Sequence, residues 1–236
     1  MASEDQIQLF ELAGAAQPDP STETVDRARL LLDAKLPIPP GLYADMQDLR
    51  QHCSNCFRCE LSQTRKQVVP GEGNPLADIL IVGEGPGQTE DETGLPFVGR
   101  SGELLDKILA SVNLTREKDV FICNVVKCRP PENRDPKPNE IAACNGYLRE
   151  QIRLVDPKII LLTGKVAMAT LLGIKQGITK VRGQWIEQEG RWYMPIFHPA
   201  YLLRNQSREK GSPKWLMWQD IQTVKAKLEE FSGRQA

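Results

Sequence analysis

The sequence predicts an α/β fold in which helices cover both faces of a parallel β-sheet. Four short and almost continuously apolar runs lie at residues 78–82, 120–126, 158–163 and 192–197. Segments with the three- to four-residue spacing of Leu, Ile and Ala that is typical of helices separate these runs. Strands that are apolar at every position are buried on both faces, which is the pattern of a parallel sheet between two helical layers.

The elements follow one another in a regular order along the chain. The predicted helices cover residues 101–112, 138–154, 165–172 and 213–231. Gly83 ends the first strand, Gly164 ends the third, and His198 follows the fourth. Because proline cannot donate to a β-ladder, Pro195 places the fourth strand at an edge or at a local irregularity.

Residues 1–45 are predicted to form an acidic N-terminal extension that ends in a proline-rich linker. They carry three basic and eight acidic side chains, whereas residues 46–236 carry 27 basic and 23 acidic ones. Within the extension, Ser21 is expected to cap a helix that runs through Leu32, and the proline-rich residues 36–41 then form a stiff linker. The folded domain is therefore expected to span residues 46–236.

Composition excludes several classes of protein. Hydrophobic residues make up 40 % of the chain, which is enough for a core. No run of 18 apolar residues and no secretory signal are present, so we expect no membrane span and a cytoplasmic location. Six cysteines in 236 residues are too few for a disulfide scaffold, so thiolates are expected to be available for a metal.

Polar residues are predicted to gather at one edge of the sheet. The first strand runs into the loop GEGPG, which contains Glu84, Asn124 lies late in the second strand, and His198 follows the fourth. Ligands bind outside the carboxyl ends of parallel strands, so these three side chains are expected to converge. The loop matches neither the P-loop nor the dinucleotide fingerprint. A simple strand-to-helix turn is the alternative.

Two further loops contain candidate ligand-binding residues. Phe97 lies in the long connection 88–99, where its ring could cover a planar base or could anchor the loop to the core. In the loop after His198, Leu202 or Leu203 could insert into a base stack while Arg204 holds phosphates. A solvated turn is the competing interpretation of this second loop.

The cysteine spacing indicates a metal site. Three of the six cysteines form a C-x2-C-x2-C motif: Cys53, Cys56 and Cys59. Cys128 and Cys144 supply a second pair, and Cys123 is expected to be a small core residue within the second strand. Spacing alone does not distinguish a four-thiolate zinc site from an iron–sulfur cluster. It also does not show which two of Cys53, Cys56 and Cys59 would be ligands.

The sequence resembles the family 4 uracil-DNA glycosylases, the iron–sulfur type of bacteria and archaea, over roughly residues 49–230. The shared motifs are GEGPG at 83–87, GLPFVG at 94–99, NVVKCRPPENR at 124–134 and HPAYLLRN at 198–205. The resemblance implies a three-layer α/β/α sandwich with a four-stranded parallel sheet. It also implies a [4Fe–4S] cluster whose ligands are Cys56, Cys59, Cys128 and Cys144, with Cys53 as an additional cysteine.

The resemblance further implies a role for each matched residue. Glu84 positions water, Phe97 stacks on the base, Asn124 reads the uracil edge, His198 bonds to the departing base, Glu90 crowds the base C5 and Gly85 offers a backbone contact. The expected function is DNA repair, in which uracil is flipped out of DNA, its N-glycosidic bond is hydrolysed and an abasic site is left. A non-catalytic metal-containing module that binds damaged DNA is the alternative, and an electron-transfer protein is a third hypothesis.

Residues Gln6–Phe10 resemble the Q-x-x-L-F pentapeptide by which bacterial replication and repair proteins bind the sliding clamp. Leu9 and Phe10 would fill an apolar pocket, and Gln6 would hydrogen-bond at its rim. An ordinary amphipathic segment is the alternative. The protein is expected to be a monomer that acts at the nucleoid of a bacterial or archaeal cell.

Overall fold

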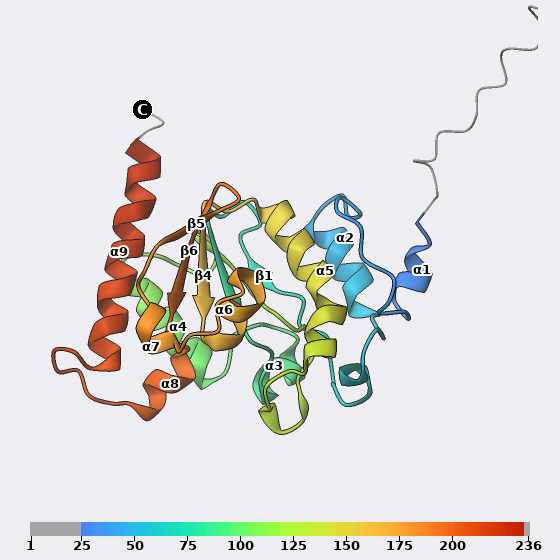
Figure 1. The fold of residues 1–236 in the computed structure, drawn as a ribbon, viewed down its shortest axis with the longest axis horizontal. Helices are drawn as coiled ribbons and strands as arrows, with labels where there is room; N and C mark the ends of the chain where they lie inside the picture. The colour runs from blue at the N-terminus through green and yellow to red at the C-terminus, as the bar shows by residue number, and fades with distance from the viewer. Residues whose placement is uncertain (1–24, 234–236) are drawn as a thin grey trace, which may run out of the picture.

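A six-stranded sheet forms the centre of the computed structural model, which describes residues 25–233 (Figure 1). The strands are β1 (Glu72–Gly73), β2 (Ile79–Gly83), β3 (Val120–Asn124), β4 (Ile159–Thr163), β5 (Ile186–Gln188) and β6 (Arg191–Ile196), in the order β1-β3-β2-β4-β6-β5. The central strands β3, β2, β4 and β6 are parallel and are the four that the sequence predicts.

The predicted sheet of four parallel strands is corrected at both edges. The β1 strand pairs antiparallel with β3, and β5 pairs antiparallel with β6, so the sheet is mixed. These two strands have two and three residues and carry polar side chains, so they give no apolar run in the sequence. The β6 strand lies between β4 and β5, so it is not an edge strand. Pro195 is paired with Leu162 of β4 but lies beyond the last pair of the β5–β6 ladder, on the side where its missing N–H is tolerated.

Helices cover both faces of the sheet and confirm the three-layer prediction (Figure 1). They are α1 (Arg27–Leu30), α2 (Met46–Ser54), α3 (Gln88–Thr93), α4 (Arg100–Ala110), α5 (Pro138–Val155), α6 (Lys165–Leu172), α7 (Ile178–Val181), α8 (Pro199–Arg204) and α9 (Pro213–Gly233), with 3-10 turns at Glu60–Gln63 and Pro131–Asn133. Leu80 and Ile160 face a core shared with α2, α5 and α6. Ile81 and Leu161 face a second core shared with α4, α8 and α9.

Local sequence signals explain where the longer helices begin and end. The α5 helix begins at Pro138, and the Glu140 carboxylate accepts a hydrogen bond from the Lys137 N–H at 2.7 Å. It ends at Val155, and the next residue, Asp156, caps it with a left-handed φ of 48°. The six-residue helices α3 and α8 were not predicted, because they are too short to show apolar periodicity.

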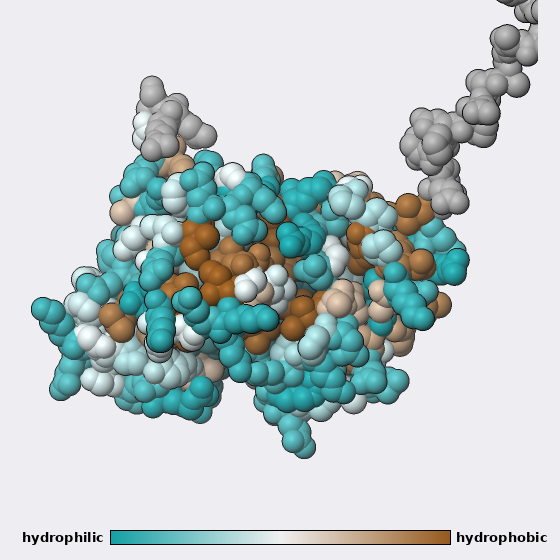
Figure 2. Space-filling model, viewed as in Figure 1, coloured by the Kyte–Doolittle hydropathy of each residue, from teal (hydrophilic) through white to brown (hydrophobic). Residues whose placement is uncertain are grey.

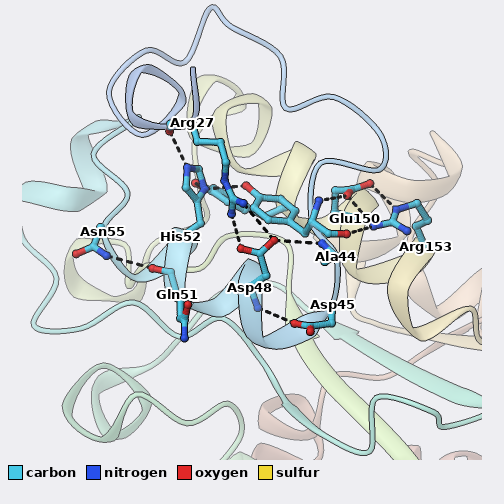
Figure 3. Close-up of polar contacts among 11 residues, drawn as sticks. Arg27, Ala44, Asp45, Asp48, Gln51, His52, Asn55, Glu150 and Arg153 are labelled. Atoms are coloured by element: carbon cyan, nitrogen blue, oxygen red, sulfur yellow. Dashed lines mark hydrogen bonds and ion pairs between the residues drawn. The ribbon is translucent and has the colours of Figure 1, made fainter. Parts of the chain in front are cut away.

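Residues 25–45 pack against α2 and α5 (Figure 3). Asp48 on α2 accepts hydrogen bonds from Arg27 and from the Ala44 N–H, and His52 Nε2 lies 2.7 Å from the Arg27 carbonyl oxygen. Glu150 on α5 accepts from the Gly41 N–H and from Arg153. Of the helix expected from Ser21, the structure has the single turn α1, and residues 1–24 lie outside the described residues.

Apolar residues gather near the middle of the face seen in Figure 2, and others lie at its right-hand end in the region of α1, with hydrophilic residues around them. Within residues 25–233, no helix combines the length and apolarity that crossing a membrane requires.

Candidate active site and cysteine cavity

A cavity of about 650 Å³ opens at the carboxyl ends of the parallel strands. In Figure 2 the lower outline of the molecule is notched between α8 and the region of α3, and residues of both helices line the cavity. Seven of the residues predicted from the sequence line it: Glu84, Gly85, Glu90, Phe97, Asn124, His198 and Arg204. Leu202 and Leu203 do not. The expected convergence at this edge of the sheet is therefore present.

The absence of a side chain at Gly83 brings two of these residues together. A Cβ atom at Gly83 would lie 2.2 Å from Asn124 Oδ1 and 2.6 Å from the Phe97 ring, which real Cβ atoms do not tolerate. Asn124 is the last residue of β3 and only 1 % exposed, and its Oδ1 atom is buried with no hydrogen-bond partner. Because an unpaired buried acceptor is costly, this atom indicates a ligand that donates a hydrogen bond.

The Phe97 ring is held in place through its backbone. Phe97 has a left-handed φ of 53°, which is unfavourable for a bulky residue. Arg116 donates to the Phe97 carbonyl oxygen at 2.6 Å, and a Cβ at Gly102 would lie 1.7 Å from the same oxygen. The ring centroids of Phe97 and His198 are 5.7 Å apart. Phe97 is thus both an anchor of its loop and an aromatic wall of the cavity.

His198 is fixed as a neutral imidazole. It caps α8, and its Nδ1 atom accepts a hydrogen bond from the Ala200 N–H at 3.1 Å. Burial, assisted by the charge of Arg204, lowers the pKa of His198 from 6.5 to about 4. A neutral ring that accepts at Nδ1 carries its proton on Nε2, so His198 offers one N–H donor at neutral pH.

Glu84 lies in a partly buried position near an ion pair that the sequence analysis missed. Burial and the charge of Asp135 raise the pKa of Glu84, and the charge of Lys165 opposes them. The Lys165 Nζ atom lies 2.6 Å from a carboxylate oxygen of Asp135, and both residues line the cavity. Lys165 was detectable in the sequence, because it directly follows the glycine that ends the third predicted strand.

Glu90 organises the loops around the cavity. Its Oε1 atom accepts hydrogen bonds from the Val98 and Gly99 N–H groups at 2.9 and 2.8 Å. Its Oε2 atom accepts from the Gly87 N–H at 3.1 Å. These bonds tie α3 to the loop that carries Phe97. The predicted role of Glu90 in crowding the base C5 stays a prediction.

The two leucines after His198 differ in their surroundings. Leu202 is 1 % exposed and belongs to the core shared with α4 and α9, whereas Leu203 is half-buried and Arg204 is exposed. An insertion of Leu202 into a base stack would require its removal from that core. The insertion of either leucine stays a prediction, and Leu203 is the one that could insert without leaving the core.

A second cavity is lined by five cysteines: Cys53, Cys56, Cys59, Cys128 and Cys144. All are free thiols, and Cys123 is buried within β3 as predicted. Within residues 25–233, no three His, Cys, Asp or Glu side chains lie close enough together to hold a single metal ion. In an iron–sulfur cluster, by contrast, each iron takes one thiolate, so the sulfur atoms surround the cluster instead of converging on one atom.

The donors and charges around this cavity fit such a cluster. Arg65 donates to Cys128 Sγ at 3.4 Å, and the Lys127 N–H donates to Cys144 Sγ at 3.3 Å. Arg58 also lines the cavity, and among the described residues its lining includes no carboxylate. Burial raises the pKa of Cys128 to about 12, so its thiolate form requires a compensating positive charge. Cationic surroundings and N–H donors to sulfur suit an anionic thiolate-bound group.

The chain is similar to known uracil-DNA glycosylases. The family model of the uracil DNA glycosylase superfamily matches residues 70–222. The type-4 uracil-DNA glycosylase of Thermotoga maritima is 46 % identical over 183 residues, which cover 77 % of this chain and 93 % of the relative.

Two proteins of Pyrobaculum aerophilum separate the subfamilies. Its type-4 uracil-DNA glycosylase is 46 % identical over 171 residues, which cover 68 % of this chain and 85 % of the relative. Its type-5 uracil-DNA glycosylase is 26 % identical over 204 residues, which cover 74 % and 90 %. The similarity is therefore much greater to the type-4 protein.

Proposed function

This chain belongs to the uracil-DNA glycosylase superfamily and, within it, to the type-4 enzymes, and we propose that it hydrolyses the N-glycosidic bond of uracil in DNA. The observation that carries this proposal is the buried, unpartnered Oδ1 atom of Asn124, in a cavity with an aromatic wall and a neutral N–H donor. Because a base inside a duplex is out of reach, the nucleotide must first be flipped into this cavity.

Asn124 is suited to distinguish uracil from cytosine. Its Oδ1 atom can accept from the N3–H of uracil, and its amide nitrogen can donate to O4. Cytosine has an acceptor at N3 and a donor at N4, so both hydrogen bonds would be lost. A mismatched buried polar pair costs about 1–3 kcal/mol. The ring of Phe97 would stack on the base, and the Gly85 backbone would contact it.

Glu84 and His198 are proposed to carry the chemistry. As the bond between C1′ and N1 breaks, positive charge develops on the sugar and negative charge on the uracil. Glu84 orients a water molecule and stabilises the sugar cation, and its raised pKa makes it a stronger base for the water proton. The Nε2–H group of His198 donates to the uracil oxygen where charge develops. The water oxygen bonds to C1′ as its proton passes to Glu84, and the electron pair of the broken bond leaves on the uracil anion. Uptake of a proton by this anion gives free uracil beside the abasic site.

We further propose that Cys56, Cys59, Cys128 and Cys144 hold a [4Fe–4S] cluster. When bound, such a cluster would cross-link three segments of the chain through iron–thiolate bonds and so order the loops between them. A visible absorption spectrum distinguishes it from zinc, which is colourless. Each ligand changed to Ser is expected to lose the absorbance, whereas Cys53→Ser is expected to keep it. Loss of absorbance in Cys53→Ser with retention in Cys56→Ser would reassign the ligand.

Release of uracil from defined single- and double-stranded oligonucleotides tests the proposed activity. We expect Asn124→Ala and His198→Ala to lose most uracil release while they still bind DNA. The non-catalytic damage-binding alternative, which family membership disfavours, predicts binding with no release by the unaltered protein. Association with a sliding clamp through Gln6–Phe10 stays a prediction, and this pentapeptide lies outside the described residues. The monomeric state and the nucleoid location also stay predictions.

A further inference from the structure

The side chain of Lys127 is buried, lines the cysteine cavity and contacts the backbone of Asn124, which lines the active-site cavity. Lys127 is 1 % exposed, although lysine is among the residue types that are least often buried. Its Nζ atom donates to the Asn124 carbonyl oxygen and to Gln151 Oε1, both at 2.5 Å. Both acceptors are neutral. Burial of a charge costs desolvation free energy that neutral acceptors offset only in part. A negatively charged group nearby would account for a lysine at this position.

On the side of the active site, Lys127 fixes the residue that reads the base. Asn124 and Lys127 are three residues apart, and the bond from Nζ closes this turn of chain directly after β3. Gln151 on α5 holds the ammonium from the other side and is itself fixed, because its Nε2 atom donates to the Pro70 carbonyl oxygen at 2.5 Å. The main chain of Asn124 is thereby tied to α5.

On the other side, the same residue forms part of the cysteine cavity. Lys127 lines that cavity, its N–H donates to Cys144 Sγ, and the next residue in the chain is Cys128. Four thiolates around an iron–sulfur cluster leave a net negative charge, and its complement is a buried ammonium that has no carboxylate partner among residues 25–233. The missing counter-charge of Lys127 is therefore supplied if the cavity holds an anionic group.

We propose that Lys127 is a positioning residue that couples the cysteine cavity to the base-reading Asn124; this inference rests on the proposed function. Its charge offsets the thiolate-bound group, and its ammonium holds the Asn124 carbonyl in place. The substrate specificity of the active site then depends on a residue that does not line the active-site cavity.

The test compares three full-length, iron-loaded variants with the unaltered protein. Lys127→Met removes the charge and both hydrogen bonds. Gln151→Met keeps the charge and releases one side of the ammonium. Lys118→Met, an exposed lysine at the opposite end of β3, is the matched control. The measurements are the iron content per chain, the midpoint potential of the cluster by protein-film voltammetry, and the single-turnover rate of uracil release.

Lys127→Met is expected to have a more negative midpoint potential, because a nearby positive charge stabilises the reduced cluster. Its rate of uracil release is expected to fall roughly ten- to a hundredfold, as a misplaced base-reading residue implies. Gln151→Met is expected to keep the potential and to lose rate. Lys118→Met is expected to change neither.

A purely structural role for Lys127 predicts a lower melting temperature with an unchanged potential and an unchanged rate per iron-loaded chain, and that result overturns the proposal. An unchanged rate alone also overturns it, because the link to Asn124 is then absent. If Lys127→Met does not load iron, the rate of uracil release by Gln151→Met is used instead: a lower rate supports the proposal, and an unchanged rate overturns it. Failure of the proposed function is distinguishable, because the unaltered protein then releases no uracil.

Discussion

The neutral state of His198 makes a prediction that can be tested at the level of single atoms. His198→Asn keeps the cap of α8, since an asparagine oxygen can accept the Ala200 N–H, but it shortens the donor and removes the titrating ring. Loss of one such donor to developing charge costs about a hundredfold or more in rate. We therefore expect uracil release to fall by about that factor, while stability at pH 7 changes little.

The pKa of His198 also fixes the sign of a stability effect. Above pH 6.5 the ring is neutral in both the folded and the unfolded chain, so it contributes no pH dependence. As the pH falls from 6.5 toward 4, the unfolded chain takes up a proton that the folded chain does not. The folded state loses about 3 kcal/mol over this window. His198→Asn is expected to lose less stability over the same range.

Nuclear magnetic resonance of ¹⁵N-histidine-labelled protein measures both properties. The chain has only two histidines, His52 and His198, and the variant assigns them. We expect the His198 signals to show protonated Nε2 and unprotonated Nδ1 down to below pH 5. A His198 pKa near 6.5, or a proton on Nδ1, would refute the assignment of a neutral Nε2–H donor. Urea unfolding at pH 7, 6 and 5 checks the stability effect independently.

Three further changes give measurable outcomes. Asp135→Asn is expected to shift the acidic limb of the pH–rate profile to lower pH, because it removes a negative charge that raises the pKa of Glu84. Lys165→Met is expected to shift the same limb to higher pH, because it removes a positive charge that lowers this pKa. Shifts in the same direction would contradict this electrostatic account. Gly83→Ala is expected to lower uracil release about a hundredfold or more, because its methyl group collides with the base-contacting amide and ring; oligonucleotide assays on folded variant protein check this. Deletion of residues 1–12 is expected to abolish binding to a bacterial sliding clamp in a pull-down and to leave uracil release intact.

The sequence predicted the parallel part of the sheet well because its strands are buried on both faces. Every residue of β2, β3 and β4 is buried, so their apolar runs are continuous and easily seen. Burial on both faces also predicts that the strands are parallel, and the carboxyl ends of parallel strands lie at the same edge of a sheet. Glu84 and Asn124 could therefore be placed together at that edge. The edge strands escaped prediction because their pairing depends on backbone groups that any residue offers.

The part of the active site built from backbone contacts could not be predicted in the same way. The role that the resemblance implies for Glu90 at the base C5 stays a prediction, but nothing in the sequence indicated its three main-chain N–H partners, which α3 and the following loop bring together. Leu202 was expected as one candidate for insertion, but whether a leucine in a short helix faces the core or the solvent depends on how that helix packs. Neither outcome is encoded in a local spacing of residue types.

Buried cations show the same limit most clearly. Arg58 is 7 % exposed and donates to four main-chain carbonyl oxygens, three of which belong to residues 30–36, and so fastens part of the predicted extension to the domain. Lys127 likewise bonds to a main-chain carbonyl. Because every residue carries a carbonyl, and because the neutral Gln151 that also accepts from Lys127 gives no charge pattern, the sequence predicts both cations as exposed surface charges. Both cations line the cysteine cavity, and the short stretch from Asn124 to Cys128 connects that cavity to the active site, because Asn124 lines the active-site cavity whereas Lys127 and Cys128 line the other.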